Sequence, residues 1–164
     1  MRIFKHRWRD ADDARRALGP GTTERLTERV RASELHHSGE IRVCVEAGLP
    51  LSYLWRDATP RERAVTLFGK LRVWDTEHNN GVLIYLLLAE RCIEIVADRG
   101  IDARVADTHW QSLVAGMSQA FHDGRFEAGL NAAIDAVGAL LDEHFPIQGN
   151  TRNANELPDA PVIV

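Results

Sequence analysis

Cysteine is scarce in this sequence, which has only Cys44 and Cys92 among its 164 residues. Two cysteines cannot form the disulfide framework of a small secreted protein. A chain of this length buries roughly two-thirds of its unfolded surface, so it needs neither a disulfide nor a metal in order to fold. Both cysteines fall inside predicted strands, where a cysteine usually serves as a small buried apolar residue.

Long apolar runs and an excess of basic charge are also absent. The longest apolar run, residues 82–89, has eight residues, whereas a membrane-spanning helix needs about 20. Residues 1–10 are charged and no apolar stretch follows them, so they do not form a secretory signal. The net charge of −4 disfavours a general nucleic-acid binder. We therefore expect a cytoplasmic protein with reduced cysteines, no transmembrane segment and no nucleic-acid partner.

The composition that is present, 45% apolar and 27% charged residues, is that of one globular domain. Residues 1–21 mix charges and end in Gly-Pro-Gly, which predicts an N-terminal arm with a short helical piece at 12–18. The domain itself is expected at 22–145. Residues 146–164 are expected to form a C-terminal tail, which is either disordered or adds 162–164 as an edge strand to this sheet or to another.

Hydrophobic periodicity predicts the elements of the domain. Helices are expected at about 23–36, 60–73, 107–122 and 125–144, and strands at 40–46, 82–88 and 91–97. Thr59 is expected to cap the second helix, Pro60 fits its first position, and Glu62 completes a capping box. A loop that contains Trp55 should precede this helix.

The order of these elements predicts the sheet. The first strand, helix and second strand suggest a right-handed parallel crossover, and the short link to the third strand suggests an antiparallel hairpin. The second strand is apolar on both faces, so it should lie inside a sheet that helices cover on both sides. The sequence therefore predicts an α/β protein, an α/β/α sandwich with a small mixed β-sheet flanked by helices.

Polar residues converge on one edge of this predicted sheet. The two parallel strands begin there, next to Glu40 and Asn80, and the third strand ends there at Asp98. The following helix starts nearby at Asp107, although this residue could serve only as its N-cap. Carboxylate and amide oxygens suit Ca²⁺ or Mg²⁺ and not zinc. The candidate metal ligands are therefore Glu40, Asn80, Asp98 and Asp107.

A cation at this edge would also suit phosphate-monoester chemistry. The metal would neutralise phosphate oxygens and orient water, and Arg99 could add a bidentate phosphate contact. The chain has no glycine-rich phosphate loop, and Ser38 and Ser112 lack the context of a catalytic nucleophile. Catalytic residues are therefore left unassigned.

Six short segments share the order and spacing of a known family. They are 38–43 (SGEIRV), 64–68 (AVTLF), 79–85 (NNGVLIY), 95–101 (IVADRGI), 123–130 (DGRFEAGL) and 155–159 (NELPD). Over about residues 22–164 the chain resembles the TPM domain family, which is named for phosphatase-like proteins. The resemblance implies an α/β/α sandwich, an acid phosphatase activity reported for some members, and calcium binding. The family positions that match are Glu40, Asn80, Asp98 and Asp107.

Many relatives carry a secretory signal and a C-terminal membrane helix, and a glycine-rich turn where this chain has Asp-Arg-Gly at 98–100. The chain looks like the short, soluble bacterial branch of the family. The resemblance implies membrane-anchored TPM or LemA-type proteins as partners.

Two hypotheses for the function follow. One is a non-enzymatic adaptor or regulator that binds a partner protein through its edge loops or tail, helped by a divalent cation. The alternative is a weak metal-dependent acid phosphatase that acts on phosphomonoesters.

Overall fold

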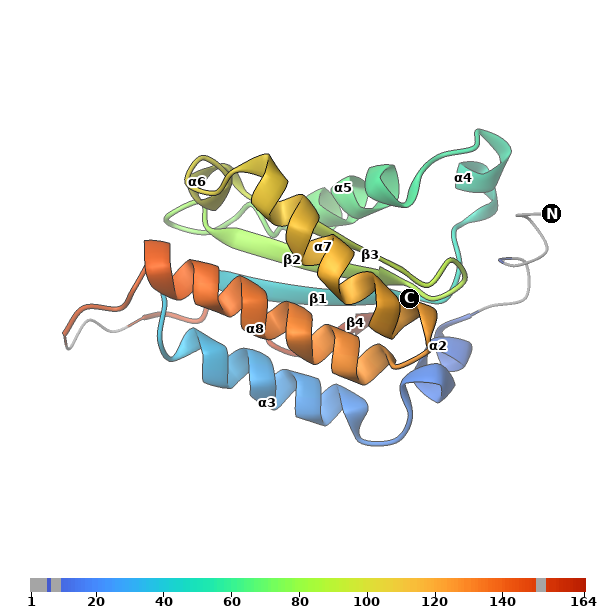
Figure 1. Ribbon diagram of the computed structural model, residues 1–164, viewed down its shortest axis with the longest axis horizontal. Coiled ribbons are helices and arrows are strands. Elements are labelled where there is room, and N and C mark those ends of the chain that lie inside the picture. Colours follow the sequence, from blue (N-terminus) through green and yellow to red (C-terminus); the bar gives the residue numbers. More distant parts are fainter. Residues whose placement is uncertain (1–5, 7–9, 150–152) are drawn as a thin grey trace.

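The computed structural model describes residue 6 and residues 10–149 and 153–164 (Figure 1). The rest of the predicted arm, residues 1–5 and 7–9, lies outside this range. The described helices are α2 (Ala11–Leu18), α3 (Thr22–Glu34), α4 (Leu51–Trp55), α5 (Pro60–Lys70), α6 (Arg99–Asp102), α7 (Asp107–His122) and α8 (Phe126–His144). The described strands are β1 (Glu40–Glu46), β2 (Gly81–Leu87), β3 (Cys92–Ala97) and β4 (Val162–Ile163).

The four strands form one mixed sheet in the order β3-β2-β1-β4. β1 and β2 are parallel, with Glu40 opposite Gly81, and β3 returns antiparallel to β2. The predicted parallel crossover and hairpin are therefore confirmed. β4 lies parallel to β1, with Cys44 opposite Val162.

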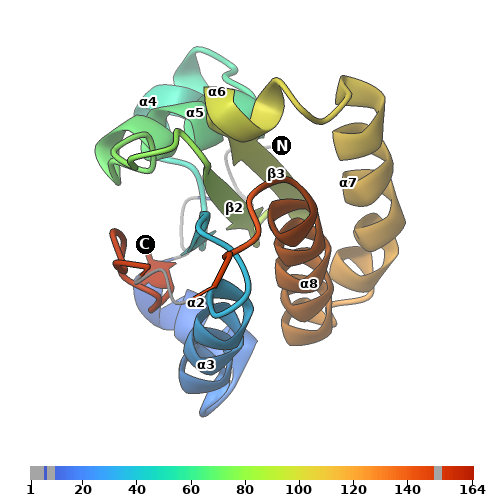
Figure 2. The same cartoon turned by 90° about the vertical axis from the view of Figure 1, so that its left-hand side faces the viewer.

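Helices cover both faces of this sheet (Figure 2). On one face, the side chains of Val43 and Ile84 pack into a core with residues of α2, α3, α7 and α8. On the other face, Leu83 and Tyr85 pack with residues of α4 and α5. Every residue of β2 is buried, as its apolar character on both faces predicted. The α/β/α sandwich is thus confirmed.

The capping box predicted at the start of α5 is present in the structure. The Thr59 hydroxyl accepts from the backbone N–H of Glu62, and the Glu62 carboxylate accepts from the backbone N–H of Thr59. This helix ends at Lys70, a little before the expected end, because the chain turns through Arg72 in a left-handed conformation. The expected loop around Trp55 is instead the short helix α4, and Trp55 is exposed.

The short helical piece expected at 12–18 is the helix α2, and both ends of the described chain pack onto the domain. α2 begins at a capping box between Asp10 and Asp13, and its Ala14 and Leu18 are buried in the core. At the other end, the Val164 N–H donates to the Val45 carbonyl, which extends the pairing of β4 with β1. Of the two alternatives for the tail, the structure has the edge strand on the chain's own sheet.

Candidate functional site

Three of the four candidate ligands lie at one edge of the sheet. Residues 38–40 lead into β1, 79–81 lead into β2, and 98–100 follow β3, and we call these three segments the loop edge. The backbone N–H of Asp98 donates to the Gly81 carbonyl at 2.9 Å, which ties the end of β3 to the start of β2. The strand ends that carry Glu40, Asn80 and Asp98 therefore lie side by side, as the topology predicted.

Asn80 is fully buried at the start of β2. Its backbone N–H donates to the Thr76 hydroxyl, and its side-chain N–H donates to the Ser38 hydroxyl, each at 3.2 Å. Its side-chain oxygen Oδ1 is also buried and has no hydrogen-bond partner in the described part of the chain. A buried acceptor without a donor lowers the stability of the folded protein by about 1–3 kcal/mol, and we call such an atom an orphan oxygen.

Asp98 is buried at the end of β3 and caps α6. One carboxylate oxygen, Oδ1, accepts from the backbone N–H of Arg99 at 2.8 Å. The other oxygen, Oδ2, is buried and has no partner among the residues that the structure describes. The loop edge thus holds a second orphan oxygen, and the exposed Arg99 lies directly beside it in the chain.

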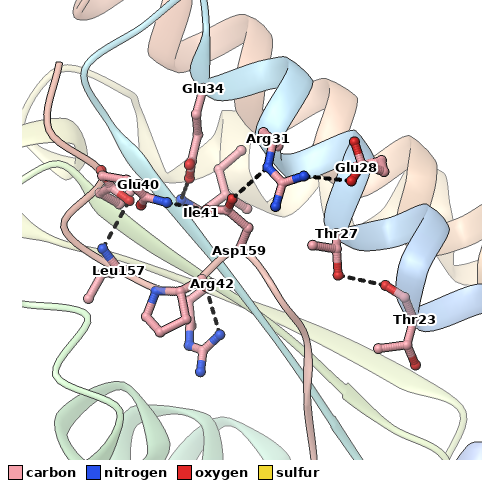
Figure 3. A network of polar contacts seen from close by, with 12 residues as sticks. Thr23, Thr27, Glu28, Arg31, Glu34, Glu40, Ile41, Arg42, Leu157 and Asp159 are labelled. Carbon is pink, nitrogen blue, oxygen red and sulfur yellow. Dashed lines mark hydrogen bonds and ion pairs between the residues drawn. The ribbon is translucent and has the colours of Figure 1, made fainter. Parts of the chain in front are cut away.

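Glu40 is fully buried, but its carboxylate already has two donors (Figure 3). The backbone N–H groups of Glu156 and Leu157 donate to its two oxygens at 3.1 and 3.2 Å. Burial raises the pKa of Glu40 to about 7, although these two N–H groups act to lower it. In this structure Glu40 fastens the C-terminal segment, residues 153–164, to the start of β1.

Two further carboxyl groups surround Glu40, and sequence reasoning missed both. Burial, and then the charge of Glu40, raise the pKa of Glu34 to about 9, and Glu34 accepts from the Ile41 N–H at 2.8 Å. Asp159 accepts from Asn155 at 2.8 Å. The three acids line a cavity of about 460 Å³. One signal was available, since an acidic residue in the last turn of a helix, such as Glu34, opposes the helix dipole.

Arg42 completes the attachment of the C-terminal segment. It lies in β1, and its Nη1 donates to the carbonyl oxygens of Pro158 and Ala160 at 2.7 and 2.5 Å. Together, Glu40 and Arg42 hold the backbone of the C-terminal segment along β1 (Figure 3). The segment reaches the sheet edge through these two side chains before β4 begins.

Asp107, the fourth candidate, is placed differently. It is the exposed first residue of α7 and lines a separate cavity together with Glu94 and Asp102. Within the described ranges, no group of three or more His, Cys, Asp or Glu side chains is arranged to hold a metal ion. The side chains at the loop edge that have unused oxygens are Asn80 and Asp98. Their oxygens are of the hard type that Ca²⁺ and Mg²⁺ prefer.

The two cysteines lie in strands, as expected. Cys44 is buried in β1, and burial raises the pKa of its thiol to about 12. Cys92 is the first residue of β3. Because the thiolate is the nucleophilic form, the raised pKa makes Cys44 chemically inert at neutral pH.

Comparison with known proteins assigns the family. The TPM domain model matches residues 11–140, so this chain belongs to the TPM domain family. The match begins at α2, within the residues that the composition assigned to an arm. No curated protein matches the chain in sequence. Over the described residues, no helix combines the length and the apolar character needed to span a bilayer.

Two solved structures resemble the fold. The BA42 protein from the psychrophilic bacterium Bizionia argentinensis is 28% identical, with a TM-score of 0.75 over 88% of this chain and 93% of that chain. The N-terminal domain of a protein from P. gingivalis is 19% identical, with a TM-score of 0.61 over 85% of this chain and 98% of that chain. The second likeness concerns the fold alone.

Proposed function

We propose that this TPM-domain protein is a non-enzymatic adaptor or regulator that binds a divalent cation and a partner protein at the loop edge. The observation that carries the proposal is the pair of orphan oxygens, Asn80 Oδ1 and Asp98 Oδ2. Both are acceptors, they belong to neighbouring strand ends, and both are buried. Each oxygen could serve as a ligand of a Ca²⁺ or Mg²⁺ ion, which would remove the cost of leaving that oxygen without a donor.

The surroundings of the loop edge support a partner site. Trp74 stands shortly before β2 with 48% of its surface exposed, and the Arg72 guanidinium lies 5.7 Å from its ring centre. Tryptophan and arginine are the residues that most often dominate the binding energy of protein interfaces. A cavity of about 470 Å³ lies at the loop edge itself, lined by Ser38, His78 and Glu156 among others. The resemblance to the family supports membrane-anchored TPM or LemA-type proteins as the partner.

Calorimetric titration tests the cation. We expect wild-type protein to bind Ca²⁺ or Mg²⁺ in preference to Zn²⁺, and Asp98→Ala to weaken this binding by at least about tenfold, since a charged ligand is lost. Asp98→Asn serves as a second variant, because asparagine preserves the helix cap while it removes the charge. Asp12→Ala, at an exposed residue of α2, is the control that should bind as the wild type does. An absence of binding in the wild type would overturn the proposal.

The alternative is a weak metal-dependent acid phosphatase, and the exposed Arg99 beside Asp98 is the feature that favours it. A guanidinium next to a cation would bind two oxygens of a phosphate. Turnover of p-nitrophenyl phosphate by highly purified protein is the assay, with Ca²⁺ or Mg²⁺ between mildly acidic and neutral pH. Metal-dependent turnover that Asp98→Ala abolishes would replace the adaptor with the phosphatase.

A further inference from the structure

β3 is the outermost strand of the sheet, and no described strand pairs with its outer side. In an antiparallel pair, alternate residues direct their backbone groups toward the partner strand. The Asp98 N–H donates to Gly81 of β2, so the residues in step with Asp98 also face β2. The backbone N–H and C=O groups of Ile93, Ile95 and Ala97 therefore point away from the sheet.

A contact made by Arg61 shows that a donor can reach this outer side. Arg61 comes from α5, and its guanidinium donates to the outward carbonyl of Ile95. The same guanidinium lies 3.6 Å from the Glu94 carboxylate. A charged side chain over an edge strand is a common way in which proteins keep such an edge from pairing with the wrong chain. Ile93 and Ile95 are only 3% and 5% exposed, so a strand that pairs with this edge must displace the Arg61 side chain from the Ile95 carbonyl.

A cavity of about 540 Å³ lies along this edge, between β3 and α7. Its apolar wall includes Ala97, Trp110 and Val114. Three carboxylates line it, namely Glu94 from β3, Asp102 from α6 and Asp107 from α7, against the one guanidinium of Arg61. The cavity is therefore net negative, and burial raises the pKa of Glu94 despite the nearby Arg61. It would complement a basic side chain.

We propose that the edge of β3 binds an extended peptide of a partner protein, which adds to the sheet as a further strand and places a lysine or arginine side chain in the acidic cavity. Strand addition uses main-chain hydrogen bonds for affinity and a pocket for alternate side chains for specificity. β3 supplies the outward backbone groups of Ile93, Ile95 and Ala97, and the cavity supplies the pocket. The inference shares with the proposed function only the premise that the chain binds a protein partner, since this surface is not the loop edge.

Fluorescence anisotropy with short labelled peptides tests the proposal on the wild-type protein. The probe alternates valine and lysine over seven residues, and its controls are the same peptide with glutamate for lysine and the same peptide with N-methylated valines. An N-methylated backbone cannot donate to a strand edge, and the acidic cavity repels glutamate, so both controls should bind at least about tenfold more weakly. Equal binding of the N-methylated peptide, or no binding of the lysine peptide, would overturn the proposal.

Variants locate the site. Glu94→Gln should weaken the binding of the lysine peptide about three- to tenfold at low salt, because a partly buried carboxylate is lost. Arg61→Ala should strengthen the binding of this peptide, because the Ile95 carbonyl becomes available and a positive charge that repels lysine is removed. Glu24→Gln, on the exposed surface of α3, should have no effect.

Amide NMR shifts separate this proposal from the loop-edge site. The peptide should shift the amide signals of Ile93, Ile95 and Ala97. We expect these shifts whether or not the protein binds Ca²⁺. Shifts confined to residues 79–81 and 98–100 would contradict the β3 site while they leave the loop edge in place. Concentration-dependent dimers in sedimentation that the peptide does not dissociate would assign this edge to a second copy of the chain instead.

Discussion

At the scale of single residues, the buried acids are the most informative feature. Glu40 and Glu34 have their pKa raised to about 7 and about 9 in the folded protein, mainly by burial. A folded-state pKa above the unfolded value means that the fold favours the protonated acid. The contribution of each acid to the stability of the fold is fully present below the pKa of the unfolded chain. It is lost as the pH rises through the pKa of the folded protein.

Stability should therefore fall as the pH rises from about 5 through 7 and on toward 9. Each unit of pKa shift corresponds to about 1.4 kcal/mol, so Glu40 contributes a change of at most about 3–4 kcal/mol. Thermal unfolding at pH 5, 7 and 9 measures the decline. Glu40→Gln should flatten it between pH 5 and 7, whereas Glu24→Gln, at an exposed residue of α3, should not. A wild-type melting temperature that is constant over this range would refute the assignment.

A second buried cluster lies at the other end of β1, around Glu46. Arg63 donates to both oxygens of Glu46, and the Tyr85 hydroxyl donates to Glu46 Oε2 at 2.6 Å. Burial acts to lower the pKa of Arg63, but the hydrogen bonds and charge of Glu46 raise it overall, and burial raises the pKa of Tyr85. Arg63 therefore stays charged and Tyr85 stays neutral across the accessible pH range.

Arg63→Ala should destabilise the protein by about 3–5 kcal/mol, because it leaves the Glu46 charge buried and without its cation. Urea unfolding measures the loss. Arg72→Ala is the matched control, since Arg72 makes an exposed ion pair with Asp75 that is worth at most about 1 kcal/mol. Replacing Glu46 by leucine together with Arg63→Leu should recover part of the stability. A loss for Arg63→Ala no larger than that of Arg72→Ala would show that the pair is not isolated from water.

At the scale of elements, the sequence was most informative where the pattern is local. The alternation in β1, the capping box at Thr59 and the apolar spacing in α8 are each contained in a short stretch, so these elements could be predicted. The helix at 12–18 and the edge-strand alternative at 162–164 were also within reach, but the packing of Ala14 into the core and the pairing of β4 with Cys44 of β1 were not, because they depend on residues distant in the sequence. Two residues of strand carry no pattern of their own.

The glycine at the start of β2 marks a close approach that only the fold reveals. A Cβ on Gly81 would lie 2.1 Å from the Val73 carbonyl oxygen, so Gly81→Ala should cost more than about 2 kcal/mol. Gly116, in α7, has open space around it, and Gly116→Ala should be neutral or stabilise by up to about 1 kcal/mol. Melting temperatures of the two variants decide this. Equal effects would mean that residues 73 and 81 are not packed as described.

At the scale of the whole molecule, topology could be used to predict which residues meet at the loop edge, but not what each one does there. Parallel strand starts placed Glu40 beside the start of β2. The sequence could not reveal that Glu40 would bind the backbone of residues 156–157, because that contact joins positions more than a hundred residues apart. Nor could it reveal the orphan oxygens, since the fold alone decides whether a buried oxygen has a donor within reach.

The central claim is that a divalent cation binds at Asn80 and Asp98. Amide NMR spectra of the wild-type protein, recorded during titration with Ca²⁺ and then with Mg²⁺, test it most directly. We expect saturable shifts of the amide signals of Gly81, Arg99 and Gly100, and no shift of the Gly116 signal. Spectra that do not change with either cation, or shifts confined to exposed acids elsewhere on the surface, would contradict it.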